Sequence, residues 1–178
     1  MSESEEETIV TAPSAPSDPT DGGHLADVHA IEQLLYRYAI AIDTCDLAAL
    51  DDVFTPDAVL DMSVAGRQTP AEYKAKAERV LAELDATHHL MASPVVTVAG
   101  DAATAHTYYQ AQHARNDCSG GPLLLIGGWI ADQLVRTGGG WRIAHRRGRA
   151  VWFDGNPAVL ELDVVVGANP AMVAVRRS

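Results

Sequence analysis

The stretch from Thr87 to Arg115 constrains the fold of this chain more than any other part of its sequence. It holds two segments rich in β-branched and aromatic residues, one on each side of Gly100-Asp101. Residues of this kind favour strands, and a Gly-Asp pair between two such segments is typical of a β-hairpin. The sequence therefore predicts a long antiparallel hairpin against which the rest of the chain packs.

Three histidines stand in the arms of this hairpin, far from its turn: His88, His89 and His113. A two-residue turn at Gly100-Asp101 would place His88 opposite His113, whereas a three-residue loop or one bulge would place His89 there. Neutral histidine is well suited to move protons near pH 7, so a facing pair is a candidate acid–base site. The alternative is that one ring packs in the core and the others face water.

Three helices are predicted before the hairpin. The first covers residues 25–43, where apolar residues recur every three or four positions along one helical face. A short second helix follows Asp46, and Thr55-Pro56-Asp57 ends it before a short strand at Ala58–Met62. The third begins at Thr69 with a capping-box pattern and a proline at its first position.

Two long strands are predicted after the hairpin, at residues 123–136 and 141–153, with a turn between them. This order of elements predicts an α+β fold. Three helices would pack on a curved mixed or antiparallel sheet and enclose a pocket with it.

One domain is expected at residues 24–157. Residues 1–23 are acidic and then rich in proline and serine, which predicts a disordered tail. Residues 158–178 would form an extension in which the apolar run Val164–Val166 docks another copy of the chain, giving a homodimer or homotrimer.

The charge and cysteine content exclude several classes of partner. The formal net charge of −11 argues against binding to nucleic acid or to an anionic membrane surface, both of which need clustered Lys and Arg. No apolar stretch is long enough to span a bilayer. Cys45 and Cys118 form neither a metal motif nor a disulfide framework, so we expect free thiols and a cytoplasmic protein.

Several segments together resemble the SnoaL-like domain of the NTF2-like superfamily, the group that includes scytalone dehydratase, bile acid dehydratases and polyketide cyclases. The resemblance covers about residues 25–156, and departs from the family where Cys45 replaces a frequent Gly and Ser93 a frequent Asn. It implies the cone-shaped NTF2-like fold. The matching segments are Ile31–Tyr38, Asp43–Leu47, Val53–Ala58, Thr87–His89, Gly100–Ala103, His113, Gly140–Ile143, Trp152 and Asp154–Asn156.

The set Tyr38, Asp43, His89 and His113 is similar to the pocket of the dehydratase branch, and the resemblance favours the register that joins the last two. It implies a cofactor-free lyase or isomerase, dehydratase- or cyclase-like, acting on a small apolar cyclic carbonyl compound. His89 or His113 would be the base, and either could protonate the leaving oxygen. Tyr38 would donate to the carbonyl oxygen, and Asp43 would orient an imidazole.

Four further residues are expected to line the substrate pocket: Tyr109, Trp129, Arg147 and Trp152. Arg147 shares strand parity with Trp141, although Arg146 is an equal candidate for the inward position.

Other interpretations of the same residues stay open. Tyr38 would equally serve as a core aromatic, and Asp43 as a polar residue at a helix end. The pocket could belong to a non-catalytic binding or scaffold module, or to an epoxide hydrolase, although that chemistry requires paired carboxylates. A metal site is disfavoured because adjacent His88 and His89 would point to opposite faces of a strand.

Overall fold

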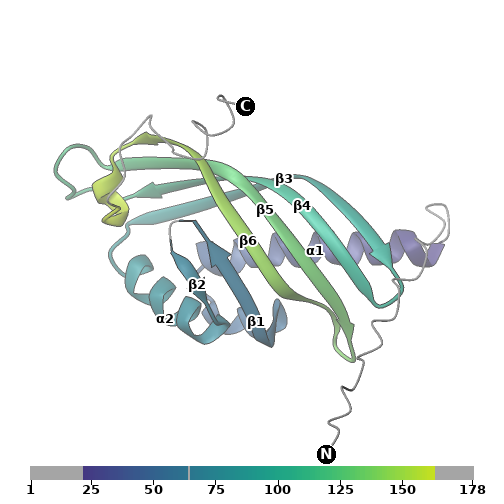
Figure 1. Ribbon diagram of the computed structural model, residues 1–178. Coiled ribbons are helices and arrows are strands. Elements are labelled where there is room, and N and C mark those ends of the chain that lie inside the picture. Colours follow the sequence, from purple (N-terminus) through teal and green to yellow (C-terminus); the bar gives the residue numbers. More distant parts are fainter. Residues whose placement is uncertain (1–21, 64, 163–178) are drawn as a thin grey trace, which may run out of the picture.

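One curved six-stranded sheet forms the body of the protein in this computed structural model, which describes residues 22–63 and 65–162 (Figure 1). The strand order is β2-β1-β6-β5-β4-β3. Strands β1 and β6 run parallel, and every other neighbouring pair is antiparallel, so the sheet is mixed as predicted. The strands are β1 (Phe54–Met62), β2 (Gly66–Gln68), β3 (Ala86–Ala99), β4 (Ala102–Ala114), β5 (Leu123–Thr137) and β6 (Gly140–Gly155).

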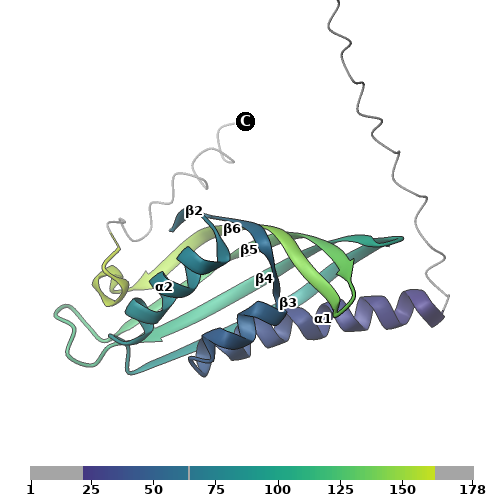
Figure 2. The ribbon, with the colours of Figure 1, turned by 90° about the horizontal axis from the view of Figure 1, so that it is seen from below.

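Helices cover one face of the sheet, which we call the inner face (Figure 2). The long helix α1 (Gly22–Asp43) lies along it, followed by the 3-10 helix η1 (Leu47–Asp52) and by α2 (Pro70–Leu81). The capping box predicted for α2 is confirmed: Thr69 Oγ1 accepts from the Glu72 backbone N–H, and the Glu72 carboxylate accepts from the Thr69 N–H. A second 3-10 helix, η2 (Pro157–Leu160), follows β6.

Two local predictions in the first half of the chain are wrong. Helix α1 begins at Gly22, inside the segment expected to be a tail. Strand β1 begins at Phe54, so Thr55-Pro56-Asp57 lies within a strand instead of ending a helix. The pairing of β1 with β6 is irregular between Phe54 and Val59, and a proline without an N–H is tolerated at such an irregularity.

Residues just after the predicted domain boundary at residue 157 also pack against the sheet. Val159 of η2 is 1% exposed and packs with Leu124, Ile126 and Ala150. Residues 1–21 and the run Val164–Val166 lie outside the described residues.

The turn of the β3–β4 hairpin has two residues, Gly100 and Asp101, because Ala99 pairs with Ala102. One extra residue then enters β3: Val95 pairs with His106, but Ala92 pairs with Tyr108. This β-bulge at Ser93-Pro94 is accompanied by a positive φ of 52° at Ser93.

Beyond the bulge, Thr87 lies opposite His113 and His89 lies opposite Ala111. Both predicted pairings are therefore wrong: neither His88 nor His89 faces His113 directly. His89 nevertheless shares the inner face with His113, as a diagonal neighbour two residues from Thr87.

A similar irregularity in β6 decides which arginine points inward. Leu134 of β5 pairs with Ile143, but the preceding Gln133 pairs with His145, so Ala144 is an extra residue in β6. The parity of the strand changes there, and Arg146 takes the inner face. The prediction of Arg147 as the inward residue is wrong, and the alternative, Arg146, is correct.

Arg146 forms a bidentate ion pair in the core. Its Nε and Nη2 donate to the two carboxylate oxygens of Asp132 at 2.8 and 2.7 Å, and both side chains are 0% exposed. Its guanidinium carbon lies 4.1 Å from the centroid of the Tyr38 ring and 5.4 Å from that of Phe54. A charged group buried to this degree depends on its partner, since an unpaired charge in the interior is costly.

We therefore expect Asp132→Asn to lower the free energy of unfolding by about 3–5 kcal/mol, since it leaves Arg146 as an uncompensated buried charge. Urea denaturation measures this change. The control is Asp52→Asn, which removes an exposed carboxylate paired with Arg142 and should cost less than about 1 kcal/mol. Equal losses in the two variants would contradict the argument.

Candidate active site

An aspartate–histidine pair joins the end of α1 to strand β3. One carboxylate oxygen of Asp43 accepts from the backbone N–H of His89 at 2.7 Å, and the other lies 2.7 Å from His89 Nδ1. Burial raises the pKa of Asp43, but the hydrogen bonds from His89 outweigh it and lower that pKa below its usual value. The ionised carboxylate is an acceptor only, so His89 Nδ1 carries a proton and Nε2 of the neutral ring keeps its lone pair.

His113 faces the same interior from β4. The ring centroids of His89 and His113 are 5.6 Å apart, and the ring planes meet at 77°. Thr87 places its hydroxyl oxygen 3.1 Å from His113 Nδ1. The structure thus brings together Asp43, His89 and His113 from three different elements.

The surroundings of His113 favour its neutral form. His113 is 7% exposed, and burial, together with the nearby charge of His89, lowers its pKa to about 4, although Asp43 acts in the opposite direction. Asp43 hydrogen-bonds His89, whereas the side-chain partner of His113 is the neutral hydroxyl of Thr87, so the two imidazoles differ in their immediate neighbours.

Two tyrosines from α1 and α2 meet in the core between the helices and the sheet. The Tyr38 hydroxyl lies 2.7 Å from that of Tyr73, and a bridge of two hydroxyls uses one proton and leaves the other free to donate. Burial, followed by the effect of Tyr38, raises the pKa of Tyr73 well above its usual value, and the same two causes raise that of Tyr109. Tyr73 and Tyr109 are therefore hydrogen-bond donors at neutral pH and not bases.

Arg146 supplies the cation nearest to the tyrosines. Its Nη1 is buried and has no hydrogen-bond partner among the described residues, as is also true of the buried Thr107 hydroxyl. Burial lowers the pKa of Arg146, but Asp132 outweighs this effect and keeps the guanidinium charged.

Three of the four residues expected to line the pocket lie on the outer face of the sheet instead. Trp129 stacks on His106 with ring centroids 5.6 Å apart, and the Arg147 guanidinium lies 6.0 Å from the Trp129 ring. Trp152 lies over Gly127. Gly127 pairs with Trp152 but Gly128 pairs with Ala150, so Val151 is a second extra residue in β6, and it places Trp152 on the outer face. Only Tyr109 points to the inner face, as predicted.

The outer face carries an open depression of about 290 Å³. Exposed apolar side chains surround it, including Leu90, Tyr108 and Trp152. A second depression, of about 420 Å³, lies between α1, η1 and the β5–β6 turn. Neither of the two depressions is lined by His89 or His113.

The homo-oligomer expected from the sequence stays a prediction.

The sequence reasoning did not select Tyr73, Thr87 or Asp132 as site residues. Thr87 could have been found from strand parity, because it is two residues from His89 and shares its face. Asp132 is the one carboxylate in the strand Leu123–Thr137, and that isolation was a usable signal.

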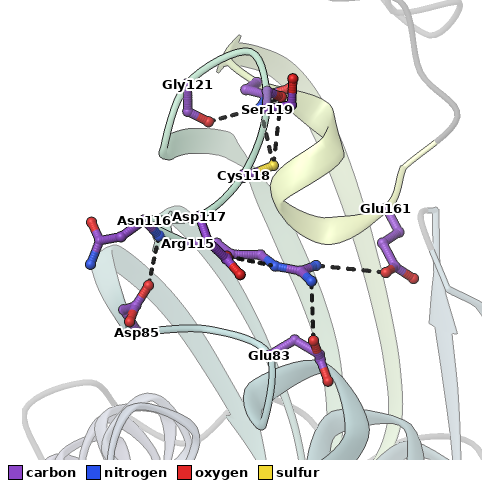
Figure 3. Close-up of polar contacts among 10 residues, drawn as sticks. Glu83, Asp85, Arg115, Asn116, Asp117, Cys118, Ser119, Gly121 and Glu161 are labelled. Atoms are coloured by element: carbon purple, nitrogen blue, oxygen red, sulfur yellow. Dashed lines mark hydrogen bonds and ion pairs between the residues drawn. The ribbon is translucent and has the colours of Figure 1, made fainter.

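A polar cluster holds the end of the sheet next to His113 (Figure 3). The Arg115 guanidinium lies 3.1 Å from Glu83, 3.4 Å from Asp117 and 3.6 Å from Glu161. Asn156 donates to the backbone oxygens of Ser119 and Gly121. These contacts tie the β4–β5 loop to η2 and to the segment after α2, and so fix the strand end that carries His113.

No group of three or more His, Cys, Asp or Glu side chains in the described part of the chain is arranged to hold a metal ion. Within the same residues, no helix is long and apolar enough to cross a membrane.

This fold is that of a SnoaL-like domain. The chain belongs to the SnoaL-like domain family, whose model matches residues 23–147. A protein of Mycobacterium tuberculosis is 34% identical over 125 residues, which are 68% of this chain and 84% of that protein. Terrestric acid biosynthesis cluster protein E of Penicillium crustosum is 30% identical over 155 residues, 84% of this chain and 98% of the relative.

Solved structures share the architecture. A protein of Kribbella flavida has a TM-score of 0.71 at 26% identity, covering 76% of this chain and 97% of its own. A hexachlorocyclohexane dehydrochlorinase, LinA type 2, has a TM-score of 0.66 at 19% identity, covering 82% and 95%, which shows the fold alone. The predicted NTF2-like fold is confirmed, since a structure of that superfamily is among these neighbours.

The two residues that depart from the family resemblance share one backbone conformation. Cys45 and Ser93 both adopt positive φ angles, 58° and 52°. Gly and Asn adopt this left-handed conformation most easily, which fits the resemblance that led us to expect them at these positions.

We expect the free energy of unfolding to fall as the pH is lowered from ~6.5 to ~4. His113 has a lowered pKa in the folded protein, so the unfolded chain binds this proton at higher pH. His113 thus makes its full contribution to the free energy of unfolding above pH ~6.5 and loses it as the pH falls toward ~4. This contribution is at most about 3 kcal/mol. The pKa of Asp43 is also lowered, and its contribution is lost only below 3.8.

Urea denaturation at several pH values tests this expectation with two variants. His113→Asn should flatten the pH dependence, whatever its effect on stability at pH ~7. His88→Asn, on the outer face, should keep the wild-type dependence. An unchanged slope in His113→Asn would show that other groups cause the loss.

Proposed function

We propose that this protein is an acid–base enzyme that eliminates water from, or isomerises, a small apolar cyclic carbonyl compound without a cofactor. The observation that carries the proposal is the Asp43–His89 hydrogen bond, which leaves Nε2 of a neutral imidazole as a base at the inner face. The Tyr38–Tyr73 hydroxyl pair, in the core between the helices and the inner face, supplies a phenolic donor.

The proposed elimination proceeds in two steps. His89 Nε2 takes a proton from the carbon next to the carbonyl, and the electron pair of the C–H bond forms an enolate. The free O–H of the Tyr38–Tyr73 pair donates to the enolate oxygen. The imidazolium of His89, stabilised by Asp43, then returns its proton to the leaving hydroxyl as the C–O bond breaks, and water is released.

Two comparisons support a reaction of this general kind. The structural neighbour LinA is named as a dehydrochlorinase, and the relative from Penicillium crustosum as a biosynthesis cluster protein. The apolar side chains around the tyrosines, among them Met91, Ile130 and Phe54, suit a ring compound with few polar groups.

A β-hydroxy tetralone is a suitable probe, since loss of water converts it into a naphthol with a distinct ultraviolet spectrum. The wild-type protein should accelerate this loss, and in D₂O should exchange the protons next to the carbonyl. His89→Ala should reduce both rates by about a hundredfold to ten-thousandfold, because it removes the base. Asp43→Asn should also reduce them, because it removes the acceptor of the Nδ1 proton.

His113→Ala should lose most of the turnover as well. If the two histidines act as a unit, the double variant should be little worse than the slower single variant. His88→Ala is the matched control and should keep wild-type rates, since its ring points to the outer face. Binding of the tetralone by the wild type with neither dehydration nor proton exchange would refute the reaction and favour a non-catalytic binding module.

Tyr38→Phe tests the donor. The change removes one hydroxyl and almost no volume, so it should cost about 1 kcal/mol of stability or less. Turnover should fall about a hundredfold, as on loss of a transition-state donor. Unchanged turnover would show that Tyr38 has a structural role, and comparison with Tyr73→Phe would show which hydroxyl donates.

A further inference from the structure

Thr87 occupies a special position beside the histidine pair. It lies directly opposite His113 in the β3–β4 ladder, and its hydroxyl oxygen is 3.1 Å from His113 Nδ1. In the described part of the chain, neither Asp43 nor any other carboxylate forms a hydrogen bond with the His113 ring. The hydroxyl of Thr87 is therefore the group that can select the tautomer of His113.

The two possible directions of this hydrogen bond leave different donors free. If His113 Nδ1 carried the proton, it would donate to Thr87 Oγ1, and the hydroxyl proton of Thr87 would have no recorded acceptor in the described part of the chain. If Thr87 donates to Nδ1 instead, the hydroxyl proton and the nitrogen lone pair are both used, and the donor left free is the ring Nε2–H, which a substrate oxygen could accept. The second arrangement places the His113 proton on Nε2.

We propose that Thr87 is a positioning residue that holds His113 in the tautomer with its proton on Nε2. The two histidines then have complementary tautomers: Asp43 leaves His89 with a lone pair on Nε2, and Thr87 leaves His113 with a donor there. One ring accepts a proton while the other donates a hydrogen bond.

The role in the reaction rests on the proposed function. His89 Nε2 takes the carbon-bound proton and later returns it to the leaving oxygen. His113 Nε2–H donates a hydrogen bond to that oxygen, which gains negative charge as the C–O bond lengthens. His113 keeps its proton throughout, so the atoms and charges of the elimination are unchanged by it.

Nitrogen NMR measures the tautomer directly. Long-range proton–nitrogen spectra of protein labelled with ¹⁵N-histidine distinguish the protonated ring nitrogen, and the His113 signals are assigned by their absence in His113→Asn. The wild type near pH 7 should show a proton on His113 Nε2. Thr87→Val, which removes only the hydroxyl donor, should shift the ring toward the Nδ1–H form, and Thr87→Ser should restore the wild-type spectrum.

The control is Thr97→Val, the same change on the outer face of the same strand, which should leave the His113 signals unchanged. A wild-type His113 with its proton on Nδ1 would overturn the proposal, and so would an unchanged tautomer in Thr87→Val. The spectrum needs no substrate, so this result is independent of the proposed reaction.

The tetralone assay tests the consequence for turnover. Thr87→Val should lower kcat about tenfold to a hundredfold with a small change in KM, and Thr87→Ser should recover most of it. A shifted tautomer with unchanged kcat would refute the catalytic role of this hydrogen bond. An inactive wild type would instead refute the proposed function and leave the tautomer result standing.

Discussion

The single extra residue in β3 determines what the inner face of this protein contains. The two-residue turn at Gly100-Asp101 fixes the first part of the hairpin, and continued without a bulge it would place His88 opposite His113. Thr87 and His89 would then point to the outer face, away from Asp43 at the end of α1. The bulge at Ser93-Pro94 reverses this parity, so the Asp43–His89 and Thr87–His113 contacts both depend on it.

Extra residues also occur in β6, where they determine which side chains lie on the inner and which on the outer face of the sheet. The extra residue at Ala144 turns Arg146 inward toward Asp132 and Tyr38. The irregularity near Val151 then places Trp152 on the outer face, over Gly127. Bulges also increase the local twist of a sheet, so the curvature that wraps the strands around α1 and the placement of the polar residues share one cause.

These irregularities explain which predictions succeeded. The hairpin, the capping box of α2 and the order of elements follow from local propensity and periodicity, and the sequence was sufficient for them. The inward or outward direction of a strand residue depends on the count of residues from a fixed pairing. The extra residue at Ala144 therefore reversed the expectation for Arg147, and the separate irregularity near Val151 sets the outward position of Trp152. His89 and His113 share a face although their predicted pairing was wrong.

The environment of the two histidines makes them chemically different although their rings are only 5.6 Å apart. Like charges at this distance oppose each other, so the pair holds one proton more easily than two. The ionised carboxylate of Asp43 lies on His89, while His113 is buried against a neutral hydroxyl. A neutral His113 therefore lies beside the imidazole that the Asp43 carboxylate orients. A site built in this way keeps a neutral donor beside its base during proton transfer, which a symmetric pair of histidines would not do.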